Sequence, residues 1–350
     1  MNANPKILII QTAFLGDVIL TLPVVQNIKQ FIHGAEVDFM CIPQTAEVLK
    51  NNPFIRELLV YDKRGKGKIS GLFRIISLVR EKNYDIIICP HRSLRSALIT
   101  HFSGAKLRIG FDKNTLSNLL TSRVVYKREF HEIERNLDLV RAIPQIKFDE
   151  ENKLLKPELF PSEEDRKYVD QLFFTLHSNH STHSIVSFAP CSKWFTKQLP
   201  ENKSVEIIEG LISRGFKLIL IGGGDDGAYC SKLEKKVSSQ SLLNLCGKLT
   251  SLQSKTAVKN SRCLISADSA AAHIGASAGT PIIQIYGSTV PAFGFYPLTS
   301  RNVIIENNSL TCRPCTNHGR KTCPLKHFLC MEGLDVKKII EAVENLITNG

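Results

Sequence analysis

The chain has 350 residues, of which 43% are hydrophobic; because this length exceeds what one core usually organises, we expect two domains. Its formal charge of +12 and pI near 9.2 favour an anionic partner: nucleic acid, anionic lipid or a phosphorylated small molecule. The sequence has no apolar run long enough to span a membrane and no signal-peptide pattern, so we predict a cytoplasmic protein.

Short apolar runs alternate with helical patterns along most of the chain. The runs are nearly continuous in Ile, Val and Leu, and strands of this kind are buried on both faces. Burial on both faces is typical of parallel sheets under crossover helices, so we predict an α/β fold. The predicted strands lie in residues 6–10, 37–42, 57–62, 84–90, 107–111, 183–190, 216–224, 261–268, 280–287 and 302–306.

The first of these runs leads directly to a carboxylate. In KILIIQTAFLGDVILTLPVVQNIKQF, residues 6–31, Asp17 follows Gly16 and lies between an apolar strand and an apolar helix that contains a proline. Ligands of doubly wound α/β folds bind beyond the carboxyl ends of the strands. Asp17 is therefore a candidate for a catalytic role, with a plain helix N-cap as the alternative.

The densest basic segment is KRGKGKISGLFRIISLVREKNYD, residues 63–85. Lys63, Arg64, Lys66 and Lys68 lie in a Gly/Lys loop, after which apolar residues recur at helical spacing. This pattern favours a surface helix whose basic entry faces an acidic ligand or a membrane leaflet. A solvated loop before an ordinary core-packed helix is the alternative.

The regular alternation lapses between about Asn152 and Ser184, where prolines, charges and a polar tract mix. We place the connection between two domains there, with the first domain at residues 1–165 and the second at 182–350. Two Rossmann-like halves with a cleft between them are expected, and ligands should bind in that cleft. The C-terminal helix either stays with the second domain or packs back on the first, and the sequence leaves both alternatives open.

Residues 222–227, GGGDDG, match the G-x-G-x-x-G fingerprint of dinucleotide sites. Asp225 and Asp226 would repel a pyrophosphate there, and no acid lies between Glu234 and Asp268, where a ribose-binding acid is expected. A nicotinamide or flavin site is therefore disfavoured. The two acids are instead candidates for contact with a ribose hydroxyl or for capping the next helix.

Two later loops carry groups suited to phosphate. In FAPCSKWFTKQLPEN, residues 188–202, a lysine precedes a helix start, and Lys197 is the first candidate for a diphosphate ligand, with Lys193 second. Further on, a strand ends at Asp268, small residues open a helix and His273 follows. Small side chains let a ligand approach the helix amides, whereas an N-cap role for Asp268 and a packed histidine are the alternatives.

Several segments together resemble the bacterial ADP-heptose:lipopolysaccharide heptosyltransferases of glycosyltransferase family 9, especially the subgroup that adds the second heptose. The resemblance covers nearly the whole chain. It implies a GT-B architecture of two Rossmann-like domains that face a central cleft, with the acceptor on the N-terminal side and ADP-heptose on the C-terminal side. The segments are LGDVILTLP (15–23), SLRSAL (93–98), HEIERNLDLV (131–140), TKQLP (196–200), DSAAAHIGASAGTP (268–281) and the cysteine-rich 312–331.

The resemblance implies roles for individual residues, with Asp17 as the general base and Lys197 as the phosphate-binding lysine. Ala270 stands where the family usually has glycine; its methyl group would weaken binding at a positive φ, and a helical φ would make it harmless. The acidic ribose contact falls near Asp225 or Asp226. The implied substrate-binding residues are Gly16, Ser192, Lys193, Asp225, Leu249, Asp268, Ser269, Ala270, Ala271 and His273.

The resemblance implies an inverting, metal-independent enzyme that moves heptose from ADP-L-glycero-β-D-manno-heptose to the lipid-anchored core oligosaccharide of lipopolysaccharide. Such an enzyme needs no cofactor and works at the cytoplasmic face of the inner membrane as a peripheral protein. Another nucleotide sugar, or non-catalytic binding of anionic lipid or nucleic acid, is the alternative. Nucleic acid is disfavoured because aromatic residues make up only 7% and no RNP-like or helix-turn-helix pattern occurs.

Ten cysteines divide into two groups. Cys312, Cys315, Cys323 and Cys330 cluster near the end, and their one CxxC pair suits a zinc site, although the second pair lacks that short spacing. Packed free thiols and a disulfide are the other possibilities, and we predict no metal ligands. The scattered remainder is expected to be reduced and buried: Cys41, Cys89, Cys191, Cys230, Cys246 and Cys263.

Overall fold

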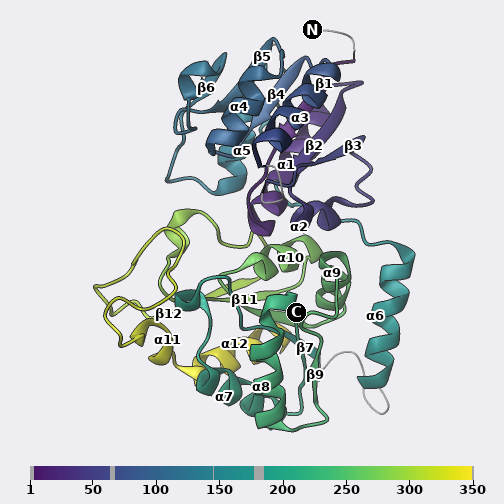
Figure 1. The fold of residues 1–350 in the computed structure, drawn as a ribbon. Coiled ribbons are helices and arrows are strands. Elements are labelled where there is room, and N and C mark those ends of the chain that lie inside the picture. The colour runs from purple at the N-terminus through teal and green to yellow at the C-terminus, as the bar shows by residue number, and fades with distance from the viewer. Residues whose placement is uncertain (1–3, 64–67, 145, 177–184, 349–350) are drawn as a thin grey trace. The chain divides into compact units, whose positions relative to one another are not determined.

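The computed structural model describes residues 4–63, 68–144, 146–176 and 185–348. The chain divides into two compact units, Met1–Phe160 and Pro161–Gly350, and each holds a sheet of six parallel strands with helices against it (Figure 1). The predicted α/β class is therefore confirmed. Most of the basic loop, including Arg64 and Lys66, lies outside the described residues.

The sheet of the N-terminal unit has the strand order β3-β2-β1-β4-β5-β6. In this doubly wound order, the chain turns from one edge of the sheet to the other between β1 and β4, and ligands bind at this switch point. The strands are β1 Lys6–Ile10, β2 Glu36–Cys41, β3 Glu57–Val60, β4 Ile86–Cys89, β5 Leu107–Phe111 and β6 Ser122–Val124. The helices are α1 Leu15–Phe31, α2 Pro43–Ala46, α3 Lys68–Glu81, α4 Leu94–Phe102 and α5 Glu132–Arg141, with single turns η1 Glu47–Leu49 and η2 Ser117–Leu119.

The C-terminal unit repeats the same order as β12-β11-β10-β7-β8-β9, so its switch point lies between β7 and β10. The strands are β7 Ile185–Ala189, β8 Lys217–Leu220, β9 Leu242–Asn244, β10 Cys263–Ala267, β11 Ile282–Tyr286 and β12 Asn302–Glu306. The helices are α6 Glu163–Leu176, α7 Glu201–Ile212, α8 Gly227–Val237, α9 Ser251–Lys259, α10 Ala270–Ala278, α11 Leu329–Glu332 and α12 Val336–Thr348, with single turns η4 Phe195–Lys197, η5 Gly224–Asp226 and η6 Pro291–Phe293.

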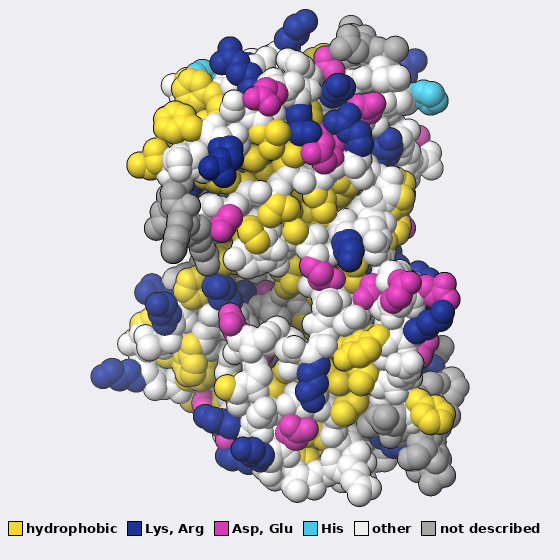
Figure 2. Space-filling model, turned by 45° about the vertical axis from the view of Figure 1, so that its right-hand side comes forward, with side chains coloured by type: hydrophobic (Ala, Val, Ile, Leu, Met, Phe, Trp, Pro, Cys, Tyr) yellow, Lys and Arg dark blue, Asp and Glu magenta, His cyan; other side chains and the backbone are white. Residues whose placement is uncertain are grey.

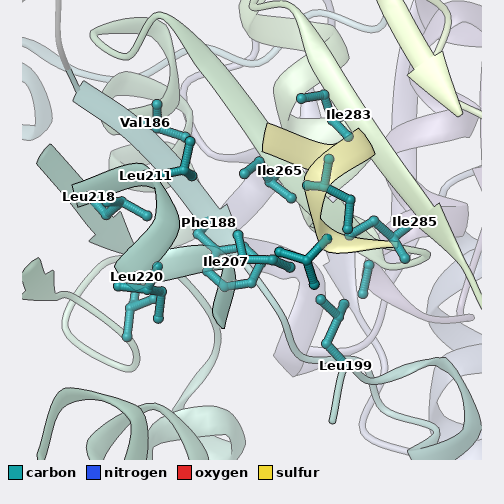
Figure 3. Packing of buried hydrophobic residues seen from close by; sticks show 14 of the residues in the cluster. Val186, Phe188, Leu199, Ile207, Leu211, Leu218, Leu220, Ile265, Ile283 and Ile285 are labelled. Atoms are coloured by element: carbon teal, nitrogen blue, oxygen red, sulfur yellow. The ribbon is translucent and has the colours of Figure 1, made fainter. Parts of the chain in front are cut away.

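The continuous apolar strands explain this architecture. Every residue of β7, β10 and β11 is buried, as two-sided coverage of a parallel sheet requires. Figure 3 shows one side of the C-terminal core, where Phe188, Ile265 and Ile285 of the strands meet Ile207 and Leu211 of α7. Helix α12 packs on α7 in the same unit.

All ten predicted strands are present, and the sheets also contain two strands that the sequence analysis missed. Both β6 and β9 have three residues and lie at a sheet edge. They are too short to show a hydrophobic pattern of their own, and β6, with the sequence SRV, is not buried.

Two further expectations concern the helices and the thiols. No helix in the described part of the chain is long and apolar enough to cross a membrane. Helix α3 is present as its spacing predicts, and it begins at Lys68, a residue that was expected to lie in the loop. The six scattered cysteines are free and buried, which confirms the prediction for them.

Candidate active site

Asp17 lies at the switch point of the N-terminal sheet. Helix α1 follows β1 after a short loop, its N-cap residue is Phe14, and Asp17 is the third residue of the helix. The plain N-cap alternative for Asp17 is therefore wrong. A carboxylate in the first turn of a helix is stabilised by the positive end of the helix dipole.

A buried polar network lies close to Asp17. The carboxylate of Glu132, at the start of α5, accepts hydrogen bonds from the Tyr126 hydroxyl (2.9 Å) and from Arg135 Nη1 (2.8 Å). Burial raises the pKa of Glu132 and the Asp17 charge adds to the rise, whereas Arg135 opposes it. The guanidinium carbon of Arg92 lies 4.5 Å from the centre of the Tyr126 ring. Asp17 thus shares its surroundings with a second carboxylate, which is paired with Arg135.

The loop after β4 is tied to the loop after β1 through His91. Its Nδ1 lies 2.9 Å from both Thr12 Oγ1 and Ser96 Oγ. Burial, with the charges of Lys63 and Arg92, lowers the pKa of His91 to about 4, so the ring is neutral at physiological pH. Lys63 Nζ donates to the Thr12 carbonyl at 2.6 Å, which brings a cation to the same edge of the sheet. The sequence analysis had singled out Lys63 but not His91.

The switch point of the C-terminal sheet holds the predicted phosphate residues. Lys197, in the single turn η4 after β7, forms an ion pair with Asp268, directly after β10 (Nζ–Oδ2 2.8 Å), and both side chains are mostly buried. The same Oδ2 accepts a hydrogen bond from Thr289 Oγ1 at 2.6 Å. The structure therefore brings together Lys197 and Asp268, which lie in two separate motifs.

Residues that follow strand β11 hold the backbone around this ion pair. Ser288 donates from its backbone N to the Thr196 carbonyl (3.2 Å) and from its hydroxyl to Thr196 Oγ1 (2.8 Å), while the adjacent Thr289 binds Asp268. Two consecutive residues thus bind Thr196, the neighbour of Lys197, and Asp268. We call Gly287, Ser288 and Thr289 the β11 strap.

Arg313 fixes the β11 strap. Its buried guanidinium donates to the carbonyls of Gly287 and Thr289, the latter at 2.8 Å, and forms an ion pair with Glu306 at 2.7 Å. A side chain at Gly287 would meet the Thr196 carbonyl oxygen at 2.7 Å, so only glycine fits this close approach. The segment after β12 thereby holds the β11 strap, and it also reaches Lys197, because a Cβ at Gly319 would meet the Lys197 side chain at 2.9 Å.

Helix α10 begins next to Asp268. Its N-cap Ser269 accepts a hydrogen bond from the Ala271 N–H through its hydroxyl (3.4 Å), and Ala270 is the first helical residue. Because the backbone of Ala270 is helical, its methyl group causes no strain. The small side chains of Ala270 and Ala271 leave the start of the helix open to an anion. His273 is buried one turn further on.

The other predicted contacts come from three loops of the same unit. Ser192 donates from its hydroxyl to the Asp268 carbonyl (3.3 Å), and Lys193 is exposed. Asp226 accepts a hydrogen bond from the Gly223 N–H (2.8 Å) and so caps the turn η5, whereas Asp225 is exposed. Asp225 is therefore the acid with greater access to a ribose. Leu249 packs partly buried against the core before α9.

The cysteine-rich segment contacts the lysine loop. Thr196 donates from its backbone N to the Arg320 carbonyl (3.1 Å), and the Arg320 N–H donates to Thr196 Oγ1 (2.7 Å). Its four cysteines are free, and the described residues contain no group of three or more His, Cys, Asp or Glu arranged to hold a metal ion. The segment thus has a visible packing role beside Lys197.

Comparison with known proteins identifies the family of this two-unit chain. The model of glycosyltransferase family 9 (heptosyltransferase) matches residues 72–328, which are most of the chain. The chain belongs to glycosyltransferase family 9. The match spans parts of both units and includes the Lys197–Asp268 pair and the β11 strap.

Relatives of this family 9 protein are distant in sequence. Lipopolysaccharide heptosyltransferase 3 of Escherichia coli K12 is 26% identical over 294 residues, which cover 79% of this chain and 81% of the relative. The solved family 9 glycosyl transferase of Veillonella parvula has a TM-score of 0.86 at 21% identity, covering 100% of this chain and 99% of that one. The solved ADP-heptose lipopolysaccharide heptosyltransferase II of Escherichia coli has a TM-score of 0.81 at 21% identity, covering 98% and 99%. The predicted family and fold are confirmed.

The site of this family 9 protein also contains residues that the sequence analysis did not identify. Glu132 and Arg135 lie in the HEIERNLDLV segment, which was noted for its resemblance without a role for either residue. Thr289 follows a strand and has no distinguishing pattern, and Arg313 lies in the CxxC pair 312–315, which was noted for its cysteines and not for the arginine. Their importance depends on contacts with residues far away in the sequence.

Proposed function

We propose that this family 9 enzyme transfers heptose from ADP-heptose to the inner core of lipopolysaccharide, with inversion at the anomeric carbon and without a metal ion. The observation that carries the proposal is the Lys197–Asp268 ion pair beside the start of α10. A mostly buried cation and the N-terminal end of a helix at one switch point form a site suited to a diphosphate. The name of the Escherichia coli heptosyltransferase II, which includes ADP-heptose, supports the same donor.

On the donor side, Lys197 and the amides at the start of α10 would bind the diphosphate. When the bond to the sugar breaks, negative charge grows on the departing phosphate, and preorganised donors stabilise that charge more than they stabilise the bound ground state. Asp268, held by Thr289, fixes the position of the Lys197 ammonium group. Asp225 is the proposed ribose contact, and Leu249 the proposed apolar contact on the adenine side.

On the acceptor side, Asp17 would act as general base. Its carboxylate takes the proton from an acceptor hydroxyl while that oxygen attacks the anomeric carbon opposite the departing ADP. The attack breaks the bond to ADP and inverts the configuration in one step, so no covalent intermediate forms. General-base catalysis of this kind contributes about 10²- to 10⁴-fold in rate.

The acceptor proposed for this reaction is the lipid-anchored core oligosaccharide at the cytoplasmic face of the inner membrane. The resemblance implies a phosphate-rich glycan, and the charge of +12 favours such a partner. Lys63 and Arg92, at the same edge of the N-terminal sheet as Asp17, are the described cations best placed to contact it.

The test is a transfer assay with purified protein. ADP-heptose, ADP-mannose and UDP-glucose are each incubated with and without truncated lipopolysaccharide. Of the three donors, we expect only ADP-heptose to release its nucleotide, and only when the acceptor is present. Transfer from one of the other donors would assign a different sugar, and no transfer from any donor would support a binding protein.

The variant Asp17→Asn isolates the general base in that assay. Because Asp17 acts on the acceptor, we expect turnover to be nearly abolished while the affinity for ADP stays within a few-fold of wild type. Asp225→Asn serves as the matched control, since it removes a carboxylate from the donor side and should weaken ADP-heptose binding. Retention of more than about a tenth of wild-type turnover by Asp17→Asn would exclude the general-base role.

A further inference from the structure

A row of apolar side chains runs along the solvent-facing side of helix α4. Leu94, Leu98 and Phe102 follow one another at intervals of four residues, so they lie in one row on the helix surface. Leu94 is 51% exposed, Phe102 is 48% exposed and Leu98 is partly exposed. An ordinary surface helix carries polar residues on this side, because its apolar residues face the core.

Helix α3 has the same property at its N-terminal end. Ile75 and Val79 face the core and are buried, whereas Ile69 and Phe73, one turn apart, are 73% and 66% exposed. Single exposed apolar residues are normal on protein surfaces, but neighbouring ones on a common face need a partner.

The two helices pack side by side, which joins these rows into one surface. At one end, Arg95 Nη1 of α4 donates to the carbonyl of Lys63, shortly before α3 (2.5 Å). At the other end, Gly104, just after α4, lies beside the side chain of Arg80. Figure 2 shows exposed hydrophobic side chains next to Lys and Arg side chains on the N-terminal unit. We call Ile69, Phe73, Leu94, Leu98 and Phe102 the α3–α4 apolar patch.

The charges around the patch have one dominant sign. Helices α3 and α4 together contain four Lys and Arg residues and a single acid, Glu81. Arg74 and Arg80 are exposed, and so is Lys106, which follows α4. Apolar side chains bordered by exposed cations are the pattern of helices that lie in the interface of an anionic membrane, whereas a protein partner would need a matching acidic surface.

We propose that the α3–α4 apolar patch inserts into the surface of an anionic lipid bilayer while its basic border binds the lipid phosphates. The inference rests on the proposed function, because a lipid-anchored acceptor requires the enzyme to work at a membrane. Lys63 also links the start of α4 with the candidate site, since its carbonyl accepts a hydrogen bond from Arg95 and its ammonium group donates to the carbonyl of Thr12, between β1 and Asp17. Membrane docking through this patch brings the acceptor side of the enzyme to its substrate.

The experiment is sedimentation with vesicles, at several salt concentrations and without any sugar substrate. Vesicles of phosphatidylethanolamine with phosphatidylglycerol are compared with vesicles of phosphatidylcholine. The variants are Ile69→Gln/Phe73→Gln for the patch and Arg74→Gln/Arg80→Gln for its border. The matched control is Phe174→Gln on α6, which is 79% exposed and lies in the other unit. All the substituted side chains are exposed, so each variant should melt at the wild-type temperature.

We expect wild type and Phe174→Gln to bind the anionic vesicles. The Ile69→Gln/Phe73→Gln variant should partition at least about 30-fold more weakly at all salt concentrations, because two large apolar side chains no longer leave water. The Arg74→Gln/Arg80→Gln variant should bind the anionic vesicles about 30-fold more weakly than wild type at low salt, with a smaller difference at high salt. The patch variant should also show a raised KM for acceptor embedded in vesicles, with an unchanged KM for a deacylated, soluble acceptor.

Three results would overturn the inference. In the first, wild type fails to bind anionic vesicles while it still transfers heptose to the soluble acceptor, which leaves the proposed function intact. In the second, Ile69→Gln/Phe73→Gln binds the vesicles as wild type does, or the control Phe174→Gln loses as much binding as Ile69→Gln/Phe73→Gln. In the third, wild type sediments as a dimer without lipid and the patch variant as a monomer, which would make the patch a contact between two copies.

Discussion

The hydroxyl of Thr289 offers a direct test of how the Lys197 ammonium group is positioned. Thr289→Val keeps the shape of the buried side chain and removes the 2.6 Å hydrogen bond to Asp268 Oδ2. A hydrogen bond to a charged group contributes about 1.5 to 3 kcal/mol, and this one lies in a site that excludes most water. The remaining partner of that oxygen is Lys197, so the carboxylate should hold the ammonium group more tightly and leave it less available to a diphosphate.

We therefore expect Thr289→Val to weaken ADP binding by about tenfold and to lower the melting temperature by roughly 3 to 10 °C. Isothermal titration calorimetry measures the first effect and thermal denaturation the second. Thr289→Ser keeps the hydroxyl and should restore most of both. The reasoning would be refuted by a valine variant with wild-type ADP affinity, or by a serine variant as impaired as the valine variant.

Three other predictions follow from the site. Lys197→Ala should weaken the binding of ADP and also slow transfer, because the cation serves both ground state and leaving group; unchanged ADP affinity in calorimetry would move the role to Lys193 or to the helix amides. Activity should persist in EDTA, since the chain lacks the Asp-x-Asp pair of metal-dependent transferases, and a loss restored by Mg²⁺ or Mn²⁺ would contradict this. Burial, Lys63 and Arg92 lower the pKa of His91 from 6.5 to about 4. Between pH 6.5 and 4, His91 is therefore protonated in the unfolded chain and neutral in the folded chain. As the pH is lowered from 6.5 to 4, the free energy of unfolding of wild type should therefore fall by up to about 3 kcal/mol more than that of His91→Asn. Urea denaturation at each pH measures both falls, and equal falls for the two proteins would disprove the prediction.

The candidate site could be predicted in part, because some of its residues lie in local patterns. Asp17 follows a strand and opens a helix, and Lys197 and Asp268 each follow a strand of the second half, so each position was visible in a short segment. Thr289 was missed because a threonine after a strand has no distinguishing pattern. Arg313 was missed because the segment that contains it was interpreted through its cysteines. Glu132 was missed as a neighbour of Asp17 because the two are more than 100 residues apart in the sequence.

The sequence by itself determined the class of the fold. Continuous Ile, Val and Leu runs are stable only between two covering layers, so ten of the strands and their parallel sheets followed from hydrophobicity alone. Only the tertiary structure decided the strand order, because that order depends on which crossover connections pack against each sheet. The same holds for the β11 strap and the α3–α4 apolar patch: the strap joins residues that meet only after the sheet forms, and the patch is exposed because no other described element covers it.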